Sequence, residues 1–198
     1  MRAKGGSPTR VLTEVLAPLP VGAALLVSVG WHSTWPGVSG AVWGSLLTVL
    51  VAGVPLAWVF HHVRQGRFTD WQVVERHRRI RPLLLVGCCF VAAWGVLLVG
   101  EGPAVLGTVL AALTTSLIVT VCVTRFWKIS VHTTVCSLAV TTLTCVGGTG
   151  ALWLTPLVGL VGWTRVRLNL HTLAQTVAGA ALGASCATAI FLATARPV

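Results

Sequence analysis

Long apolar segments separated by short polar ones run through almost the whole chain. A bilayer with a hydrocarbon core about 30 Å thick needs about 20 apolar residues per helical span, and most of these segments approach that length. Seven segments are predicted: Val11–Val29, Ala41–Phe60, Pro82–Gly100, Ala104–Thr124, Val131–Val146, Ala151–Trp163 and His171–Thr194. The pattern therefore predicts an all-α fold, a multi-pass transmembrane bundle of six to seven helices. We expect one domain over residues 1–198, with residues 1–10 as a short basic tail.

The fifth and sixth segments are short for a bilayer. They either borrow flanking residues to cross or form a hairpin that does not fully cross. Because they come as a pair, both alternatives leave the later chain on the same side. The N-terminal tail and three loops are therefore predicted to share one face: Val63–Arg81, Arg125–Ser130 and Thr164–Leu170.

Composition and charge support a membrane protein. The chain is 55% hydrophobic and only 9% charged, whereas a soluble domain carries about a quarter charged residues. The net charge of +10 does not indicate a nucleic-acid partner, because the basic residues lie in short loops between apolar segments. All but Arg196 of the 14 Lys and Arg residues fall on the predicted loop face. The positive-inside rule then predicts a cell-membrane protein whose loops and N-terminus are cytoplasmic.

The first segment is predicted to be retained as a span and not cleaved as a signal peptide. Pro18 and Pro20 interrupt it, and no convincing small-residue cleavage site precedes the polar stretch Trp31–Gly40. The six cysteines all fall inside apolar segments without the spacing of a zinc site or a disulfide framework. They are expected to be small buried hydrophobic residues.

Two histidines lie beside predicted helix N-termini on the loop face. His171 and Gln175 are four residues apart and would share one face of a helix. The Gln175 side-chain carbonyl can then accept a hydrogen bond from one imidazole nitrogen and leave the other free to attack a substrate. His132 opens the fifth segment. Free N–H groups and the helix dipole make both places favourable for an anion.

Basic residues around these histidines indicate a phosphate as that anion. Arginine offers planar paired donors and lysine a point charge, and phosphate oxygens accept from both. The candidates in the loops are Arg81, Arg125, Lys128 and Arg165. The chain has only four acidic residues and no Asp-rich cluster for Mg²⁺. We therefore expect histidine-based chemistry with no metal and no cofactor.

Three short motifs resemble those of the type 2 phosphatidic acid phosphatase superfamily. Thr164-Arg165-x5-His171-x3-Gln175 is similar to its third motif, Ser-Arg-x5-His-x3-Asp, and Ser130-Val131-His132 is similar to its Pro-Ser-Gly-His. The run from Ala178 to Gly183 also resembles the continuation after the third motif. Arg81-Pro82 matches the end of the first motif, Lys-x6-Arg-Pro.

The resemblance implies a role for each matched residue. His171 would be the nucleophile that forms a phosphohistidine, and His132 the general acid that protonates the leaving alcohol. Gln175 would orient the His171 imidazole, while Arg165 and Ser130 would hold phosphate oxygens. Lys128, Arg81, Arg125 and Arg78 complete the predicted substrate-binding set, although Arg78 is also explained as a topogenic charge.

The expected substrate is a lipid phosphate or diphosphate in the membrane, of the isoprenyl phosphate or phosphatidate type. The chain departs from the family motifs: Ile129 and Val131 replace Pro and Gly, Gln175 replaces Asp, and Val74 replaces the lysine of the first motif. These departures motivate an alternative, a catalytically decayed relative that binds lipid phosphates or assists a partner. A small transporter is a weaker alternative, because inverted halves are not evident.

Overall fold

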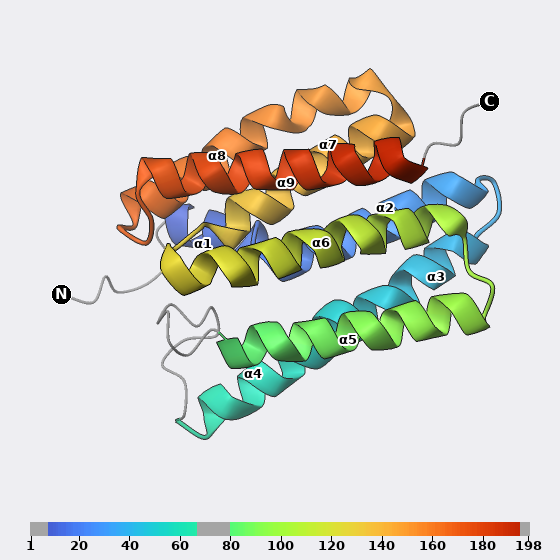
Figure 1. The fold of residues 1–198 in the computed structure, drawn as a ribbon, viewed down its shortest axis with the longest axis horizontal. Coiled ribbons are helices and arrows are strands. Elements are labelled where there is room, and N and C mark those ends of the chain that lie inside the picture. The colour runs from blue at the N-terminus through green and yellow to red at the C-terminus, as the bar shows by residue number, and fades with distance from the viewer. Residues whose placement is uncertain (1–7, 67–79, 195–198) are drawn as a thin grey trace.

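The computed structural model describes residues 8–66 and 80–194, and within them it has helices and no strand. Figure 1 shows roughly antiparallel helices packed into a bundle. The predicted all-α fold is confirmed. In chain order the elements are α1 (Pro8–Val15), α2 (Pro18–Thr34), α3 (Ser39–Thr48), the π-helix η1 (Val49–Gly53), α4 (Val54–Arg64), α5 (Ile80–Val99), α6 (Ala104–Phe126), α7 (Val131–Gly147), the 3-10 helix η3 (Thr149–Leu154), α8 (Thr155–Arg167) and α9 (Leu173–Thr194).

Three helical stretches are long and apolar enough to cross a membrane: Ser39–Arg64, Ala104–Phe126 and Leu173–Thr194. Leu84–Val99 and Val131–Gly147 are shorter apolar helices. Several large apolar side chains point outward from the bundle and are well exposed, among them Val91, Leu98, Val99, Val177 and Leu192. A surface of this kind is suited to lipid and is unusual for a soluble monomer.

The first apolar segment is not one helix, so the prediction of a single element over Val11–Val29 is wrong. Helix α1 ends at Val15, and α2 begins at Pro18. The proline ring keeps the preceding residue out of the helical region, and Ala17 accordingly has an extended backbone with φ −70° and ψ 157°. Pro18 then starts α2, where its missing N–H costs no helical hydrogen bond.

The predicted side-by-side arrangement of the loops agrees with the topology. Helices α4, α6 and α8 end, and α5, α7 and α9 begin, at the left end of the bundle in Figure 1. The α2–α3 and α5–α6 connections lie at the opposite end. All Lys and Arg positions among the described residues belong to the first end, which we call the loop end.

The fifth and sixth predicted segments form a hairpin of short helices. Helix α7 leads away from the loop end, η3 makes the turn, and α8 returns (Figure 1). With 13 residues, α8 rises about 20 Å, less than the hydrocarbon thickness of about 30 Å. The prediction that this segment is short for a span is therefore confirmed.

Helices α7 and α9 approach closely through two glycines. A Cβ on Gly179 would lie 2.6 Å from the Ser130 carbonyl oxygen and would also overlap the Thr133 hydroxyl. A Cβ on Gly183 would overlap the Thr134 carbonyl and lie 2.9 Å from the Leu138 nitrogen. The two glycines thus allow close packing of the two helices, which holds the N-terminal ends of α7 and α9 side by side.

The long helical stretch Ser39–Arg64 contains a single π-helical turn. Pro55 has no N–H to donate to the Val51 carbonyl four residues earlier. The Val54 N–H donates instead to the Val49 carbonyl, five residues back. This wider turn carries Val51 and Ala52, both of which line a cavity described below.

Candidate functional site

Helix α7 begins with a capped N-terminus that carries His132. Ser130 is the N-cap residue, with φ −89° and ψ 102°, and its hydroxyl accepts from the Thr133 N–H at 3.5 Å. The Ser130 carbonyl accepts from the Thr133 and Thr134 hydroxyls at 3.1 and 3.0 Å. These contacts fix the first turn, and His132 is its second residue.

Helix α9 begins with a capping box formed by Thr172 and Gln175. The Gln175 N–H donates to the Thr172 hydroxyl at 3.3 Å, and the Thr172 N–H donates to Gln175 Oε1 at 3.2 Å. The pair satisfies two N–H groups that otherwise lack a helical partner. His171 therefore stands just before the capped helix, two residues ahead of Leu173 where α9 begins.

Gln175 also fixes the tautomer of His171. Its Oε1 lies 3.0 Å from His171 Nδ1, so the predicted contact between the two residues is confirmed. A backbone N–H can only donate, so the Gln175 atom facing Thr172 must be oxygen. Since an amide oxygen can only accept, Nδ1 of His171 carries the proton. In the neutral ring the lone pair is then on Nε2.

The two loops that carry the histidines are joined directly. The Ser130 N–H donates to the Gln175 carbonyl at 3.3 Å. Lys128 Nζ donates to the Leu170 carbonyl at 2.6 Å. Lys128 was predicted to bind substrate, and in this structure its ammonium also holds the residue next to His171.

Arg165 lies in the last turn of α8 with only 1% of its surface exposed. Its carbonyl accepts from the Leu170 N–H at 3.0 Å and the His171 N–H at 3.3 Å. Burying a guanidinium is costly unless it is well hydrogen-bonded, and near a membrane such a charge is usually functional. Arg165 therefore supports the His171 loop through its backbone, and its side chain is a buried positive charge.

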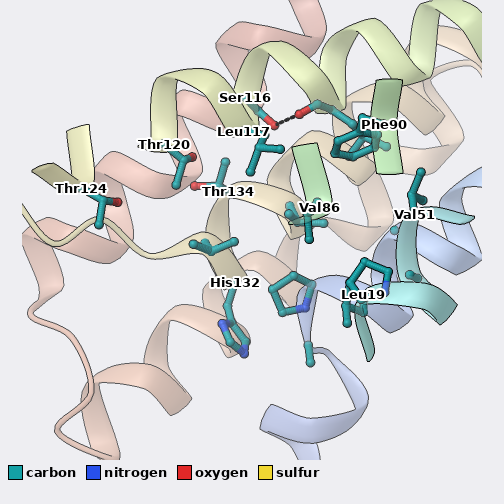
Figure 2. Close-up of a pocket in the computed structure, with 18 of the residues that line it drawn as sticks. Leu19, Val51, Val86, Phe90, Ser116, Leu117, Thr120, Thr124, His132 and Thr134 are labelled. Carbon is teal, nitrogen blue, oxygen red and sulfur yellow. Dashed lines mark hydrogen bonds between the residues drawn. The ribbon is translucent and has the colours of Figure 1, made fainter. Parts of the chain in front are cut away.

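Both histidines line one largely apolar cavity of about 210 Å³. The lining residues come from the start of α2, the η1–α4 turn, α5, α6 and α7, with His171 added from the α8–α9 loop. Figure 2 shows His132 at the edge of this cavity, whose labelled neighbours include Leu19, Val51, Val86 and Phe90. His132 and His171 are buried, with 8% and 7% of their surfaces exposed.

The remaining candidates lie at different places. Of the candidates whose side chains the structure describes, only the two histidines line the cavity. The loops around them are connected by hydrogen bonds of Ser130, Gln175, Lys128 and Arg165. Arg125 is in the last turn of α6 and is exposed. Arg81 belongs to the first turn of α5, but its side chain lies outside the described part of the chain, as do Arg78 and Val74 altogether. Within the described residues, no group of three or more His, Cys, Asp and Glu side chains is placed to hold a metal ion.

Two features of the site were missed in the sequence. The Thr172-x-x-Gln175 spacing is that of a capping box and was readable as such. Ser116, Thr120 and Thr124 recur every four residues and so share one face of α6, and all three line the cavity. This spacing is visible in the sequence, but the sequence does not say which helices line a cavity.

The double role of Gln175 gives a prediction with a matched control. Thr172→Ala removes the cap but keeps Oε1 for His171, so stability should fall by about 1 kcal/mol while most activity remains. Gln175→Leu keeps the backbone bond to the Thr172 hydroxyl but removes the side-chain half of the capping box and the imidazole contact, so kcat/KM for lipid-phosphate hydrolysis should fall about 10- to 100-fold. Gln175→Glu keeps both contacts and should stay close to wild type in thermal stability. Equal activities of the Thr172→Ala and Gln175→Leu variants would contradict the orienting role.

No family model, no curated protein and no solved structure was found to match this chain.

Proposed function

We propose that the chain is a multi-pass membrane phosphatase, resembling the type 2 phosphatidic acid phosphatases, that removes phosphate from an amphiphilic lipid through a phosphohistidine. The observation that carries the proposal is the cavity shared by His132 and His171. Two imidazoles stand at the ends of two helices, and the walls around them are mainly apolar. A phosphate on an apolar chain is the ligand that fits both parts.

The loop end favours an anion for two independent reasons. The N-termini of α7 and α9 meet there, linked by the Ser130–Gln175 hydrogen bond, and helix N-termini attract negative charge. Lys128 lies in the loop before α7, and Arg165 lies in the last turn of α8. A phosphate placed between the histidines would thus lie near both helix N-termini and be attracted by these two charges.

The hydrogen-bond pattern supports His171 as the nucleophile. Nε2 of His171 holds the lone pair because Gln175 keeps the proton on Nδ1. Attack of Nε2 on phosphorus forms the N–P bond as the bond from phosphorus to the lipid oxygen breaks. Protonated His132 gives its proton to the departing alkoxide. Water, deprotonated by the now neutral His132, then attacks phosphorus, and inorganic phosphate leaves His171 free.

Membrane placement follows from the same features. The helices would hold the lipid chain within the bilayer and present its phosphate at the loop end. The described Lys and Arg positions all belong to that end, which by the positive-inside rule would face the cytoplasm.

A panel of lipid monophosphates and diphosphates, assayed for free phosphate with purified protein in detergent, tests this function. Phosphatidate, an isoprenyl monophosphate and an isoprenyl diphosphate should be compared with and without a chelator. We expect release from at least one of them and no loss of rate with chelator. Release that requires a divalent cation would contradict the histidine mechanism.

A second candidate is a lipid-phosphate binder without turnover. Val131, where the related motif has glycine, lines the cavity and occupies space beside His132. Saturable binding of phosphatidate with no phosphate release between about pH 5 and 8, where imidazole changes charge, would favour this candidate.

A further inference from the structure

Thr120 places a hydroxyl on the wall of the apolar cavity. It lines the cavity and is only 2% exposed. Ser116, one turn away, donates to the Leu113 carbonyl at 2.9 Å, and Thr134 on α7 donates to the Ser130 carbonyl at 3.0 Å. The part of the chain that the structure describes contains no hydrogen bond to the Thr120 hydroxyl. Figure 2 shows these hydroxyls on the cavity side of α6 and α7.

The Thr120 hydroxyl can therefore donate to a ligand, whereas the hydroxyls of Ser116 and Thr134 have already used their protons. A hydroxyl has one proton and two lone pairs. Once that proton is given to a backbone carbonyl, the group can only accept. An acceptor oxygen within the lipid, and not merely its phosphate, would complete the hydrogen bonding of Thr120.

Thr120 lies a short distance along α6 from the loop end, where the phosphate would bind. It lies six residues from the end of α6 at Phe126, about 9 Å along the axis. Helix α6 has 23 residues and is about 35 Å long, slightly more than the hydrocarbon core of about 30 Å. With α6 centred on that core, Thr120 lies about 6 to 7 Å inside it, below the loop end and level with the first groups of a lipid that follow its phosphate.

The cavity volume points to the same part of the lipid. A volume of about 210 Å³, in a cavity that both histidines line, leaves room for the groups that directly follow the phosphate. In a glycerolipid these include ester carbonyls, whereas an isoprenyl chain has no oxygen there.

We propose that Thr120 is a specificity-determining residue, whose hydroxyl donates to an ester carbonyl of a diacylglycerol phosphate and so favours this substrate over lipids without that carbonyl. The proposal rests on the proposed function for its phosphate-bearing ligand. It adds selection of the lipid backbone, which neither histidine provides.

The test compares diacylglycerol phosphate with its diether analogue, which has nearly the same shape but no carbonyl oxygen. For wild type we expect kcat/KM to favour the ester over the ether by about two- to tenfold, the value of one hydrogen bond. Thr120→Val, close in shape, should remove that preference by lowering only the ester value. Thr120→Ser should keep it. Thr114→Val is the matched control on the same helix, because its hydroxyl donates to the Leu110 carbonyl and lies outside the cavity lining.

Binding of both lipids to the same variants in nanodiscs separates the two proposals. Turnover with the same ester-to-ether ratio in wild type and Thr120→Val overturns the role of Thr120 and leaves the phosphatase intact. A Thr120-dependent ester preference in binding, with no turnover of either lipid, supports Thr120 and overturns the phosphatase. Absence of ester preference in both measurements overturns the role of Thr120 whatever the catalytic result.

Discussion

His171→Ala is expected to lower kcat for lipid-phosphate hydrolysis by at least about 10³-fold, the kind of loss that follows removal of a covalent nucleophile. No other described imidazole shares its position, since His132 enters the cavity from a different helix. A phosphoenzyme formed from radiolabelled substrate should appear in wild type and disappear in this variant. It should be stable in base and labile in acid, as phosphohistidine is.

His32→Ala is the matched control for this experiment. His32 is in the last turn of α2 and lines a separate cavity at the opposite end of the bundle. The substitution removes the same side chain without touching the loop end, so activity and phosphoenzyme should remain. If hydrolysis survives both His171→Ala and His132→Ala, the histidine mechanism is wrong.

The sequence could predict that the apolar segments form helices, because a bilayer permits few other backbone structures. Apolar segments of about 20 residues must form helices to satisfy their backbone groups, and the helices from Ala104, Val131 and Leu173 onward lie close to the predicted segments. The break before Pro18 was visible as a proline but was read as an interruption of one span. The π-turn before Pro55 depends on how one helix resolves a lost hydrogen bond, and an apolar pattern does not encode that.

The site was predictable where its contacts are local and unpredictable where they cross between helices. His171 and Gln175 are four residues apart, so their contact followed from spacing. The Lys128 bond to Leu170 joins residues 42 positions apart, and no local rule predicts it. Arg165 was assigned to phosphate from its motif, but its burial depends on how α8 packs in the bundle. A role for the hydroxyls of α6 could be inferred only from the structure, because the cavity shows which face of the helix is internal.

His132→Ala is expected to slow hydrolysis of an alkyl lipid phosphate by about 10²- to 10⁴-fold, the usual contribution of a general acid. The loss should depend on the leaving group. An alkoxide needs a proton as it departs, whereas nitrophenolate leaves without one. With a nitrophenyl phosphate carrying an alkyl chain, rapid-mixing measurements should therefore show a burst of nitrophenolate at nearly the wild-type rate.

The steady state after that burst should still be slow, because His132 also activates the water that hydrolyses phosphohistidine. The phosphoenzyme should then accumulate on His171, whose Nδ1 contact with Gln175 is unaffected by the substitution. Equal losses for alkyl and nitrophenyl substrates in the burst would show that His132 does not protonate the leaving group. Its place at the second residue of α7 would then serve binding, with the helix N-terminus and the ring together holding phosphate.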